Sequence, residues 1–392
     1  MDTTKQTETY IVTVNAGSSS VKLAMFTMHR IEKKVEATVE NIGQPSASLV
    51  TAEGSKSVAA PTHTDAVTIL MKWLQDQSSE TAIVAVGHRI VHGGPKYYKP
   101  HVITNDMLAD LQHLAAFDPE HLPIELQLIT AFRKLLPNAE HVACFDTAFH
   151  HDLPTESRLL SIPRSLSNKG IRRYGFHGLS YAYILDELRR VEGDLATNGK
   201  VIIAHLGSGA SLVALRNSKP IDTTMSMTPA SGIPMSTRSG DLDPGLALYL
   251  AATEGYDAKQ FNHIAHFKSG LLGISETTAD MKKLLEIETD DERAKDAVNV
   301  FCYNVKKTIG SFAAALGGLN TLVFTGGIGE NAPKIRKRVC TGLEFLGIDL
   351  DEMRNEEGAR LISTDGSLVG VHVIHTDEAV TIARETARLI QR

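Results

Sequence analysis

The stretch "NAGSSSVK", residues 15–22, directly follows an apolar run and combines one glycine with three serines and a lysine. Glycine lets the backbone approach a ligand, serine hydroxyls donate hydrogen bonds to phosphoryl oxygens, and lysine adds a positive charge. These properties indicate a phosphate loop that uses Asn15, Ser18, Ser20 and Lys22. Glycine and serine also dominate ordinary surface hairpins, so this stretch by itself favours the two interpretations about equally.

A second glycine-rich stretch, "VFTGGIGENAPKI" at residues 323–335, is a sharper signal. We expect a buried strand to run into three glycines, after which Asn331, Ala332 and Pro333 open a helix. The N-terminus of a helix offers free N–H groups and the positive end of its dipole to an anion. The strand and helix context therefore favours anion or nucleotide binding over a simple tight turn.

Two arginines, one aspartate and one histidine stand beside turn residues. Arg89 precedes a Gly pair in "GHRIVHGG", and Arg238 lies in "MSTRSGDLDPG". Such arginines suit forked binding of a carboxylate or phosphate, although a single arginine is more often part of a surface ion pair. Asp146 ends the run "ACFD" and His177 precedes Gly178, and each is by itself more typical of a cap or a satisfied side chain.

Metal and disulfide frameworks are not indicated. His88 and His92 have helical spacing but lie in a strand-and-glycine segment, and His150 and His151 belong to no zinc-ligand pattern. The cysteines, Cys144, Cys302 and Cys340, are odd in number and far apart, so we interpret them as core thiols.

The elements that position these residues alternate between strands and helices. In the first half we expect strands at residues 10–15, 21–26, 34–40, 82–94 and 141–150, and helices at 64–74, 105–116 (capped by Asn105) and 124–136. In the second half residues 200–224 predict strand, Gly/Ser turn, strand, turn and strand, a long helix spans 294–316 before Gly317, and a buried strand follows at 321–327.

The two halves repeat one pattern. An ungapped alignment of residues 15–26 with residues 205–216 matches Gly17 with Gly207, and both stretches stand between two strands. The sequence therefore predicts duplicated α/β domains that face each other across a cleft, with one phosphate-holding hairpin in each.

Composition excludes several classes of protein. The chain has 392 residues, 42% hydrophobic and 22% charged, which is typical of a globular protein with two or three domains. A net charge of −6 without basic blocks argues against nucleic-acid binding. Because no run of eighteen apolar residues and no secretory signal is present, we expect a cytoplasmic protein without membrane contact.

Six motifs, in this order, resemble those of the acetate kinase family, which comprises acetate and propionate kinases. They are "NAGSSSVK", "GHRIVHGG", "FDTAFH", "RRYGFHG", "TRSGDLDP" and "FTGGIGEN". The resemblance covers nearly all of the chain after residue 9 and implies reversible transfer of the ATP γ-phosphoryl group to acetate, with Mg²⁺ or alternatively Mn²⁺. It also implies two ribonuclease-H-like domains of the actin-like ATPase superfamily, residues 1–148 with 380–392 and residues 149–379, and a homodimer.

The resemblance also implies roles for individual residues. Arg89 would bind the acetate carboxylate, His177 and Arg238 would donate to the moving phosphoryl group, and Asp146 would align the site or hold metal-bound water. Asn15 and Glu378 would lie near the metal. An acyl pocket would be lined by Val91, Phe117, Phe176 and Pro229. Nucleotide contacts would come from Ser18, Ser20, Lys22, His205, Leu206, Gly207, Ser208, Gly209, Asp280, Met281, Lys282, Gly327, Ile328, Gly329, Glu330 and Asn331.

Three departures from the family pattern keep alternatives open. Ser208 replaces a common Asn, which leaves pyrophosphate as an alternative phosphoryl donor. Phe117-Asp118 replaces Leu-His and would reshape the acyl pocket, so a propionate or short-chain acyl kinase is the nearest alternative. Lys282 replaces an Arg, which would loosen base selectivity. An inactive nucleotide-binding module is the alternative from another class.

Overall fold

The computed structural model describes residues 8–17, 19–77, 82–115 and 117–391, so the predicted phosphate contact Ser18 lies outside the described residues. The chain divides into two compact units. Unit 1 comprises Met1–Phe149 and Asp377–Arg392, and unit 2 comprises His150–Thr376. The C-terminal segment thus returns to the N-terminal unit.

Unit 1 is built on an eight-stranded mixed sheet with the order β5-β4-β3-β2-β1-β6-β8-β7. Strands β1, β2 and β3 are antiparallel neighbours, whereas β1, β6 and β8 run parallel. The strands are β1 (Thr9–Ala16), β2 (Val21–Thr27), β3 (Lys33–Glu40), β4 (Ser48–Thr51), β5 (Gly54–Ser57), β6 (Ala82–Ile90), β7 (His101–Val102) and β8 (Glu140–Phe145).

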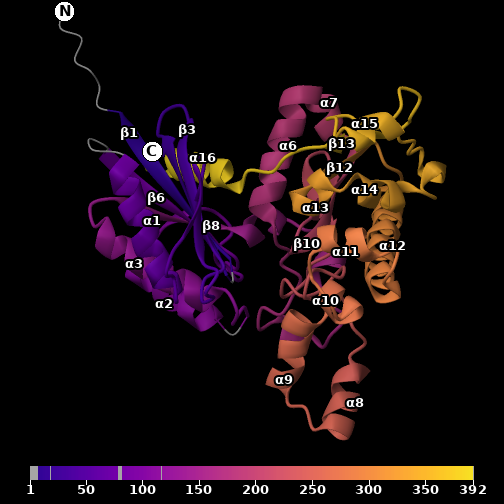
Figure 1. The fold of residues 1–392 in the computed structure, drawn as a ribbon, viewed down its shortest axis with the longest axis horizontal. Helices are drawn as coiled ribbons and strands as arrows, with labels where there is room; N and C mark the ends of the chain where they lie inside the picture. The colour runs from indigo at the N-terminus through magenta and orange to yellow at the C-terminus, as the bar shows by residue number, and fades with distance from the viewer. Residues whose placement is uncertain (1–7, 18, 78–81, 116, 392) are drawn as a thin grey trace, which may run out of the picture. The chain divides into compact units, whose positions relative to one another are not determined.

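Helices cover both faces of this sheet because successive strand residues point to opposite sides. Val12 packs against helix α1 (His63–Gln77) and helix α3 (Leu122–Leu135), which share one core cluster. Its neighbour Ile11 packs instead with Ala387 of the C-terminal helix α16 (Glu378–Ile390), drawn in yellow beside the indigo strands in Figure 1. Helix α2 (Asn105–Leu114) joins a further cluster with α3.

One predicted helix cap is wrong by a residue. Asn105 is the first residue of α2, and the preceding Thr104 is the N-cap, whose hydroxyl accepts a hydrogen bond from the Met107 amide at 3.1 Å. Both residue types are good caps, so the sequence alone did not separate them.

Unit 2 repeats the sheet of unit 1 without its extra edge strands. Its order is β11-β10-β9-β12-β13, with β9, β10 and β11 antiparallel and β9, β12 and β13 parallel. This is the arrangement of β3-β2-β1-β6-β8 in unit 1, so the predicted duplication is confirmed. The strands are β9 (Lys200–Leu206), β10 (Ala210–Arg216), β11 (Lys219–Thr223), β12 (Thr321–Thr325) and β13 (Gly370–Val373).

The helices of unit 2 include the predicted long helix. This α12 (Glu292–Leu316) ends at Gly317, whose φ of 70° is left-handed and so favours glycine. The other helices are α4 (Thr155–Arg158), α5 (Arg164–Ser167), α6 (Gly178–Glu192), α7 (Asp194–Thr197), α8 (Gly245–Glu254), α9 (Ala258–His263), α10 (Gly270–Ser275), α11 (Met281–Ile287), α13 (Gly326–Asn331), α14 (Pro333–Cys340) and α15 (Glu352–Glu356). Short turns of other helix types are η2 (Ile264–Lys268) and η3 (Glu344–Leu346) in unit 2, and η1 (Asp146–His150), of which all but His150 belongs to unit 1.

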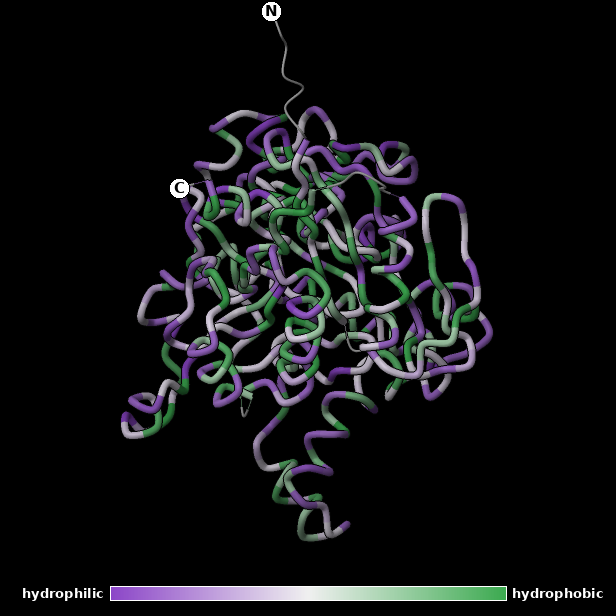
Figure 2. The backbone as a smooth tube through the Cα atoms, turned by 90° about the vertical axis from the view of Figure 1, so that its left-hand side faces the viewer, coloured by the Kyte–Doolittle hydropathy of each residue, from purple (hydrophilic) through white to green (hydrophobic). Residues whose placement is uncertain are grey.

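Hydropathy alternates along the chain as amphipathic elements require, and Figure 2 shows hydrophobic and hydrophilic stretches succeeding one another along the tube. Within the described ranges, no helix combines the length and apolar character needed to cross a bilayer.

Candidate active site

The first cluster surrounds Arg89, near the carboxyl end of β6. Its Nε lies 3.2 Å from both Asp146 carboxylate oxygens, and Nη2 donates to Oδ2 at 2.6 Å. Asp146 is fully buried and directly follows β8, the parallel neighbour of β6. Burial lowers the pKa of the Arg89 guanidinium, but the charges of Asp146 and then Glu378 outweigh it and raise that pKa. The guanidinium is therefore held charged and in a fixed plane.

Asn15 and Glu378 complete this cluster. Arg89 Nη1 donates to Asn15 Oδ1 at 3.1 Å and to the carbonyl of Ala16 at 3.4 Å, while Asn15 Nδ2 donates to Glu378 Oε2 at 2.7 Å. Glu378 begins α16, and its carboxylate lies 3.8 Å from Arg89 Nε. The structure thus brings together four predicted site residues of unit 1 at the carboxyl ends of β1, β6 and β8.

The donor set of this cluster fits a hard cation. Asp146 and Glu378 supply carboxylate oxygens and Asn15 an amide oxygen, the ligand types that Mg²⁺ and Mn²⁺ prefer. Among the described residues no group of three or more His, Cys, Asp or Glu side chains is arranged to hold a metal. A cation here would therefore depend on water and substrate oxygens for most of its coordination.

The stretch that follows β1 is a tight hairpin. The Gly17 amide donates to the Ser20 carbonyl at 2.8 Å, and His63 Nε2 lies 3.1 Å from the Gly17 carbonyl oxygen. Lys22, on β2, forms an ion pair with Glu36 of β3 at 2.9 Å and is 41% exposed. The hairpin interpretation is confirmed, and a phosphate role of the loop stays a prediction.

The second cluster lies in unit 2 around His177, the residue before α6. Its φ of 58° is left-handed, and its ring stacks on His205 with centroids 4.3 Å apart. A Cβ on Gly209, in the turn between β9 and β10, would lie 3.2 Å from His177 Nε2 and 3.6 Å from Arg238 Nη1. Arg238 Nη1 donates to the Pro229 carbonyl at 3.2 Å. The structure therefore brings His177, His205 and Arg238 close to the predicted second hairpin, and a side chain at Gly209 would crowd the His177 ring.

The stretch after β12 differs from the prediction. The three glycines do not precede the first helix but lie within it, in α13, and Pro333 then opens a second helix, α14. The Gly326 amide at the start of α13 donates to Glu330 Oε1 at 2.9 Å, and the Thr376 amide donates to the same oxygen at 3.1 Å. A side chain of the protein itself therefore binds the first amide of α13, whereas the helix that we expected to face an anion begins at Pro333.

The remaining predicted nucleotide residues have varied surroundings. Asp280 is the N-cap of α11 and accepts from the Lys282 amide at 2.9 Å, while Met281 is buried and Lys282 exposed. Ser208, whose carbonyl accepts from the Ser236 amide at 3.1 Å, is also exposed. Of the predicted acyl residues, the buried Val91 and the half-buried Phe117 belong to unit 1, and the buried Phe176 and Pro229 belong to unit 2.

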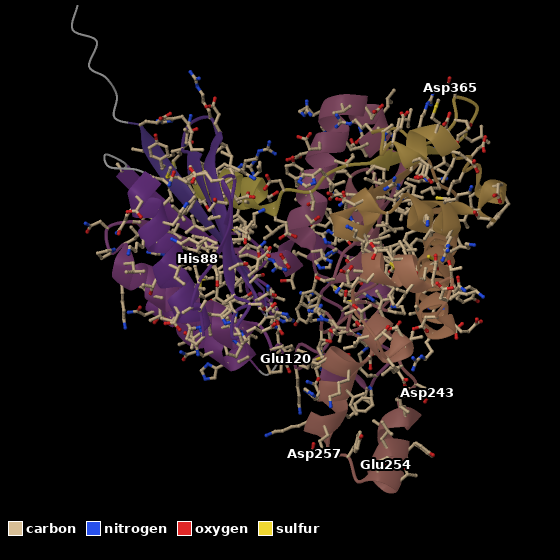
Figure 3. All side chains as sticks on the ribbon, viewed as in Figure 1. His88, Glu120, Asp243, Glu254, Asp257 and Asp365 are labelled. Carbon is tan, nitrogen blue, oxygen red and sulfur yellow. The ribbon has the colours of Figure 1, made fainter. Side chains whose placement is uncertain are left out.

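The histidines considered as metal ligands are packed side chains. His88, labelled in Figure 3, hydrogen-bonds His141 through Nε2 and Nδ1 at 3.0 Å. Burial, with a smaller effect of His141, lowers the pKa of His88 well below its usual value. Burial likewise lowers the pKa of His150 to about 4, and its Nε2 contacts the Phe176 carbonyl at 3.0 Å.

A profile of the Acetokinase family matches residues 10–384. This chain belongs to the acetokinase family. It is 41% identical to an acetate kinase of Rhodopseudomonas palustris, over 97% of this chain and 98% of the relative. Among solved structures, it is similar to a propionate kinase from Francisella tularensis (TM-score 0.90, 35% identity, 97% and 99% coverage). It is also similar to Porphyromonas gingivalis acetate kinase (TM-score 0.86, 37% identity, 97% and 100% coverage). The predicted duplicated actin-like ATPase fold is confirmed.

One buried carboxyl group, that of Glu125, was not predicted from the sequence. Both oxygens of Glu125, on α3, lie 3.1 Å from the Val91 amide nitrogen. Burial raises the pKa of the Glu125 carboxyl well above its usual value, although Arg89 acts in the opposite direction. The available signal was periodicity, because Glu125 falls on the buried stripe of Leu122, Leu126 and Ile129.

Two buried hydroxyl groups, those of Ser211 and Tyr181, were also not predicted from the sequence. Ser211 Oγ lies 2.8 Å from His177 Nδ1, and the Tyr181 hydroxyl hydrogen-bonds the same Ser211 oxygen. Tyr181 stands four residues after His177 on α6, a spacing that places side chains on one helix face. Ser211 lies 34 residues after His177, on β10, so local sequence spacing does not predict their contact.

Proposed function

We propose that this protein catalyses the reversible transfer of the ATP γ-phosphoryl group to acetate, giving acetyl phosphate and ADP. The observation that carries the proposal is the Arg89 cluster, a charged guanidinium fixed by Asp146 and Asn15 at the carboxyl ends of parallel strands. Membership of the acetokinase family supports it.

Arg89 would bind the acetate carboxylate. Its contacts with Asp146, Asn15 and Ala16 use four of the five N–H groups of a guanidinium, and among the described residues the fifth, on Nη2, has no acceptor. The side chain is 14% exposed, so this remaining donor belongs to a group that is largely removed from water. A charge-assisted hydrogen bond in such surroundings is stronger than at the surface.

Phosphoryl transfer to acetate needs no general base, because a carboxylate is already ionised near neutral pH. Asp146 is buried with both oxygens on Arg89, so we assign it the role of orienting Arg89 rather than accepting a proton. His177 and Arg238 would donate hydrogen bonds to the equatorial oxygens of the moving phosphoryl group.

Mg²⁺ would be held by Glu378, Asn15 and Asp146, directly or through water. When bound, it neutralises charge that develops on phosphate oxygens. Mn²⁺ has the same ligand preferences and is the alternative metal. Removal of the metal with a chelator is expected to abolish turnover and to be reversed by added Mg²⁺.

The nucleotide would be bound by the stretches 205–209, 280–282 and 327–331, together with Ser18, Ser20 and Lys22 of the first hairpin. ATP is the donor expected of the family. Because Ser208 is exposed and shorter than the common Asn, pyrophosphate is the alternative donor that the assay must include.

The test is an assay of the purified protein with acetate, ATP and Mg²⁺, in which hydroxylamine traps acetyl phosphate as the hydroxamate. We expect hydroxamate formation, and ATP formation in the reverse direction from acetyl phosphate and ADP. ATP binding without hydroxamate from any short acid would refute the proposal and favour the inactive nucleotide-binding module. Pyrophosphate replaces ATP in a parallel arm.

Propionate is the second candidate acceptor, since one of the similar structures is a propionate kinase. A panel of formate, acetate, propionate and butyrate separates the candidates. One methylene in an apolar pocket changes binding by about 1–3 kcal/mol, which exceeds the error of kcat/KM. We expect acetate to rank first, and a higher kcat/KM for propionate would reassign the acyl substrate.

We also propose that the protein is a homodimer, as the resemblance to its family implies. Helix α8 supports this proposal because none of its residues is buried, and Leu248 and Tyr249 are 75% and 62% exposed. Figure 3 labels Glu254, the last residue of α8, and Asp257, the N-cap of α9. Sedimentation of the wild type and of Leu248→Glu tests this, with a dimer and a weakened dimer expected. A monomeric wild type would overturn it.

We also propose that the protein is located in the cytoplasm. Cys144, Cys302 and Cys340 are all free and buried, as is usual where thiols stay reduced. Fractionation of the source cells is the direct test.

A further inference from the structure

We infer that Ser211 and Tyr181 form a hydroxyl relay that holds His177 as the tautomer with its proton on Nε2. Both are positioning residues, since they act through His177 and not on the substrate. The inference rests on the proposed phosphoryl transfer, in which His177 donates a hydrogen bond. The Ser211 and Tyr181 hydroxyls would keep a proton on the nitrogen that donates it.

The relay lies in the interior of unit 2. Ser211 and Tyr181 each have 0% exposure, and the Ser211 hydroxyl contacts both His177 Nδ1, at 2.8 Å, and the Tyr181 hydroxyl. Tyr181 is fixed to His177 a second time, because its backbone amide donates to the His177 carbonyl at 3.0 Å. The three side chains therefore come from two elements, α6 and β10, that must pack correctly for the relay to exist.

The chemistry of the hydroxyls sets the direction of the protons. A phenol is more acidic than an alkyl hydroxyl, so Tyr181 is the better donor and Ser211 accepts from it. Ser211 then has one proton left and donates it to His177 Nδ1. In the reverse arrangement His177 would donate to Ser211, and Ser211 would donate to the phenol oxygen of Tyr181, which is a poorer acceptor than an alkyl hydroxyl. The first arrangement matches the better donor to the better acceptor and is therefore preferred.

The consequence appears at the other nitrogen of the ring. With Nδ1 as acceptor, the proton of the neutral imidazole must be on Nε2. Nε2 is the atom that a Cβ on Gly209 would approach at 3.2 Å, and Arg238 Nη1 would lie 3.6 Å from the same Cβ. The relay thus directs an N–H toward the side of the Gly209 turn where Arg238 also presents its donors.

Further contacts hold the ring in this orientation. His177 has a left-handed backbone at φ 58°, which a non-glycine residue adopts only when its surroundings stabilise it. His205 stacks on the ring at an interplanar angle of 25° and is itself bound through Nδ1 to Ser180 Oγ at 2.9 Å. The stacking fixes the ring plane, and the relay selects which nitrogen carries the proton.

The kinetic test compares Ser211→Ala and Tyr181→Phe with wild type in the acetate and ATP assay. We expect Ser211→Ala to lower kcat by about 10- to 100-fold with both KM values nearly unchanged, and Tyr181→Phe to lower it less. Ser363→Ala is the matched control, because Ser363 is a buried hydroxyl of unit 2 that accepts from the Val371 amide. It should keep wild-type kcat.

The decisive measurement is ¹⁵N NMR of the histidine rings, with His177 assigned by its loss in His177→Gln. We expect wild type to show Nδ1 as an acceptor and Nε2 protonated, and Ser211→Ala to show a mixture of tautomers. An unchanged His177 signal in Ser211→Ala, or an unchanged kcat, would overturn the relay. If Ser211→Ala does not fold, Tyr181→Phe takes its place, and an unchanged His177 signal or an unchanged kcat in that variant would overturn the relay. The NMR result does not require turnover, so an inactive wild type would refute the proposed function separately.

Discussion

The two units share one strand order but place different chemistry at the ends of their sheets. In unit 1 the group near the end of β6 is Arg89, surrounded by the carboxylates of Asp146 and Glu378. In unit 2 the group beside the β9–β10 turn is the imidazole of His177, held by Ser211 and another histidine. One cluster is organised by charge, the other by neutral hydrogen bonds and stacking.

With the proposed roles, each sheet of the duplicated scaffold would serve a different part of one reaction. A charged, partly buried guanidinium suits the capture of a carboxylate, because its carboxylate partners fix its plane without occupying every donor. A neutral imidazole suits donation to a phosphoryl group, because hydroxyl partners orient it without adding charge. If the comparison is right, variants in unit 1 should alter acetate use and electrostatics, and variants in unit 2 should alter kcat.

The largest effect is expected from Arg89→Ala. Loss of the carboxylate donor should lower kcat/KM for acetate by roughly two to four orders of magnitude. It should also cost about 3–5 kcal/mol of stability, since Asp146 remains buried without its partner. Steady-state kinetics and urea unfolding measure both, and Arg190→Ala, which removes an exposed ion pair with Glu187, should change neither. If Arg89→Ala keeps the wild-type kcat/KM for acetate, Arg89 does not bind the acetate carboxylate.

Gly209→Ala is expected to act next most strongly, and on kcat. Its Cβ would lie 3.2 Å from His177 Nε2, so the ring must shift, and we expect a fall in kcat of about 10- to 100-fold. Gly310→Ala is the matched control in α12, where a Cβ would meet no atom within 4 Å. That variant should keep its kcat and gain about 0.5–1 kcal/mol of stability. A normal kcat in Gly209→Ala would contradict the role given to His177.

Glu125→Gln tests the electrostatics of unit 1 through pH. The pKa of Glu125 is raised from 4.5, so its folded form retains a proton that the unfolded chain loses. The stability that Glu125 contributes is complete below the unfolded pKa and is lost as pH rises toward the folded pKa. The glutamine side chain cannot ionise. As pH rises, the free energy of unfolding of the variant should therefore increase relative to that of wild type by up to about 1.4 kcal/mol per pH unit.

Urea unfolding of both proteins from about pH 5 to about pH 8 measures this gap. A gap that stays constant or narrows with rising pH would mean that Glu125 is ionised in the folded state. A neutral glutamine also retains a carbonyl oxygen for the Val91 amide, so the comparison isolates the charge.

The smallest effect is expected from Lys22→Gln. Its ion pair with Glu36 is at the surface, so stability should change by less than about 1 kcal/mol. If Lys22 contacts the nucleotide phosphates, the KM for ATP should rise a few-fold in a salt-dependent way. Lys34→Gln, whose lysine forms a similar pair with Glu32 at 3.4 Å, is the control. If Lys22→Gln and Lys34→Gln have the same KM for ATP, Lys22 does not contact the nucleotide.

Much of the fold was predictable because local patterns and burial agree. The apolar run before Gly17 and the alternation through residues 200–224 correspond to strands β1, β9, β10 and β11. The glycine-rich stretch after β12 was predicted less well. Three glycines within four residues are unfavourable in a helix, yet here Glu330 binds the Gly326 amide at the start of a helix. Glu330 lies in the same helix as Gly326, and no sequence motif predicts the hydrogen bond between them.

The sequence by itself determined the alternation of strands and helices, the duplication and the residue types that can bind a carboxylate and a phosphoryl group. Periodicity and short motifs carry that information locally. Only the tertiary structure decided which groups meet. Asn15 and Glu378 are 363 residues apart and hydrogen-bond because α16 returns to the first sheet. Ser211 reaches His177 because α6 packs on β9, the neighbour of β10 in the second sheet. Such partners are set by the packing of distant elements, which local spacing does not encode.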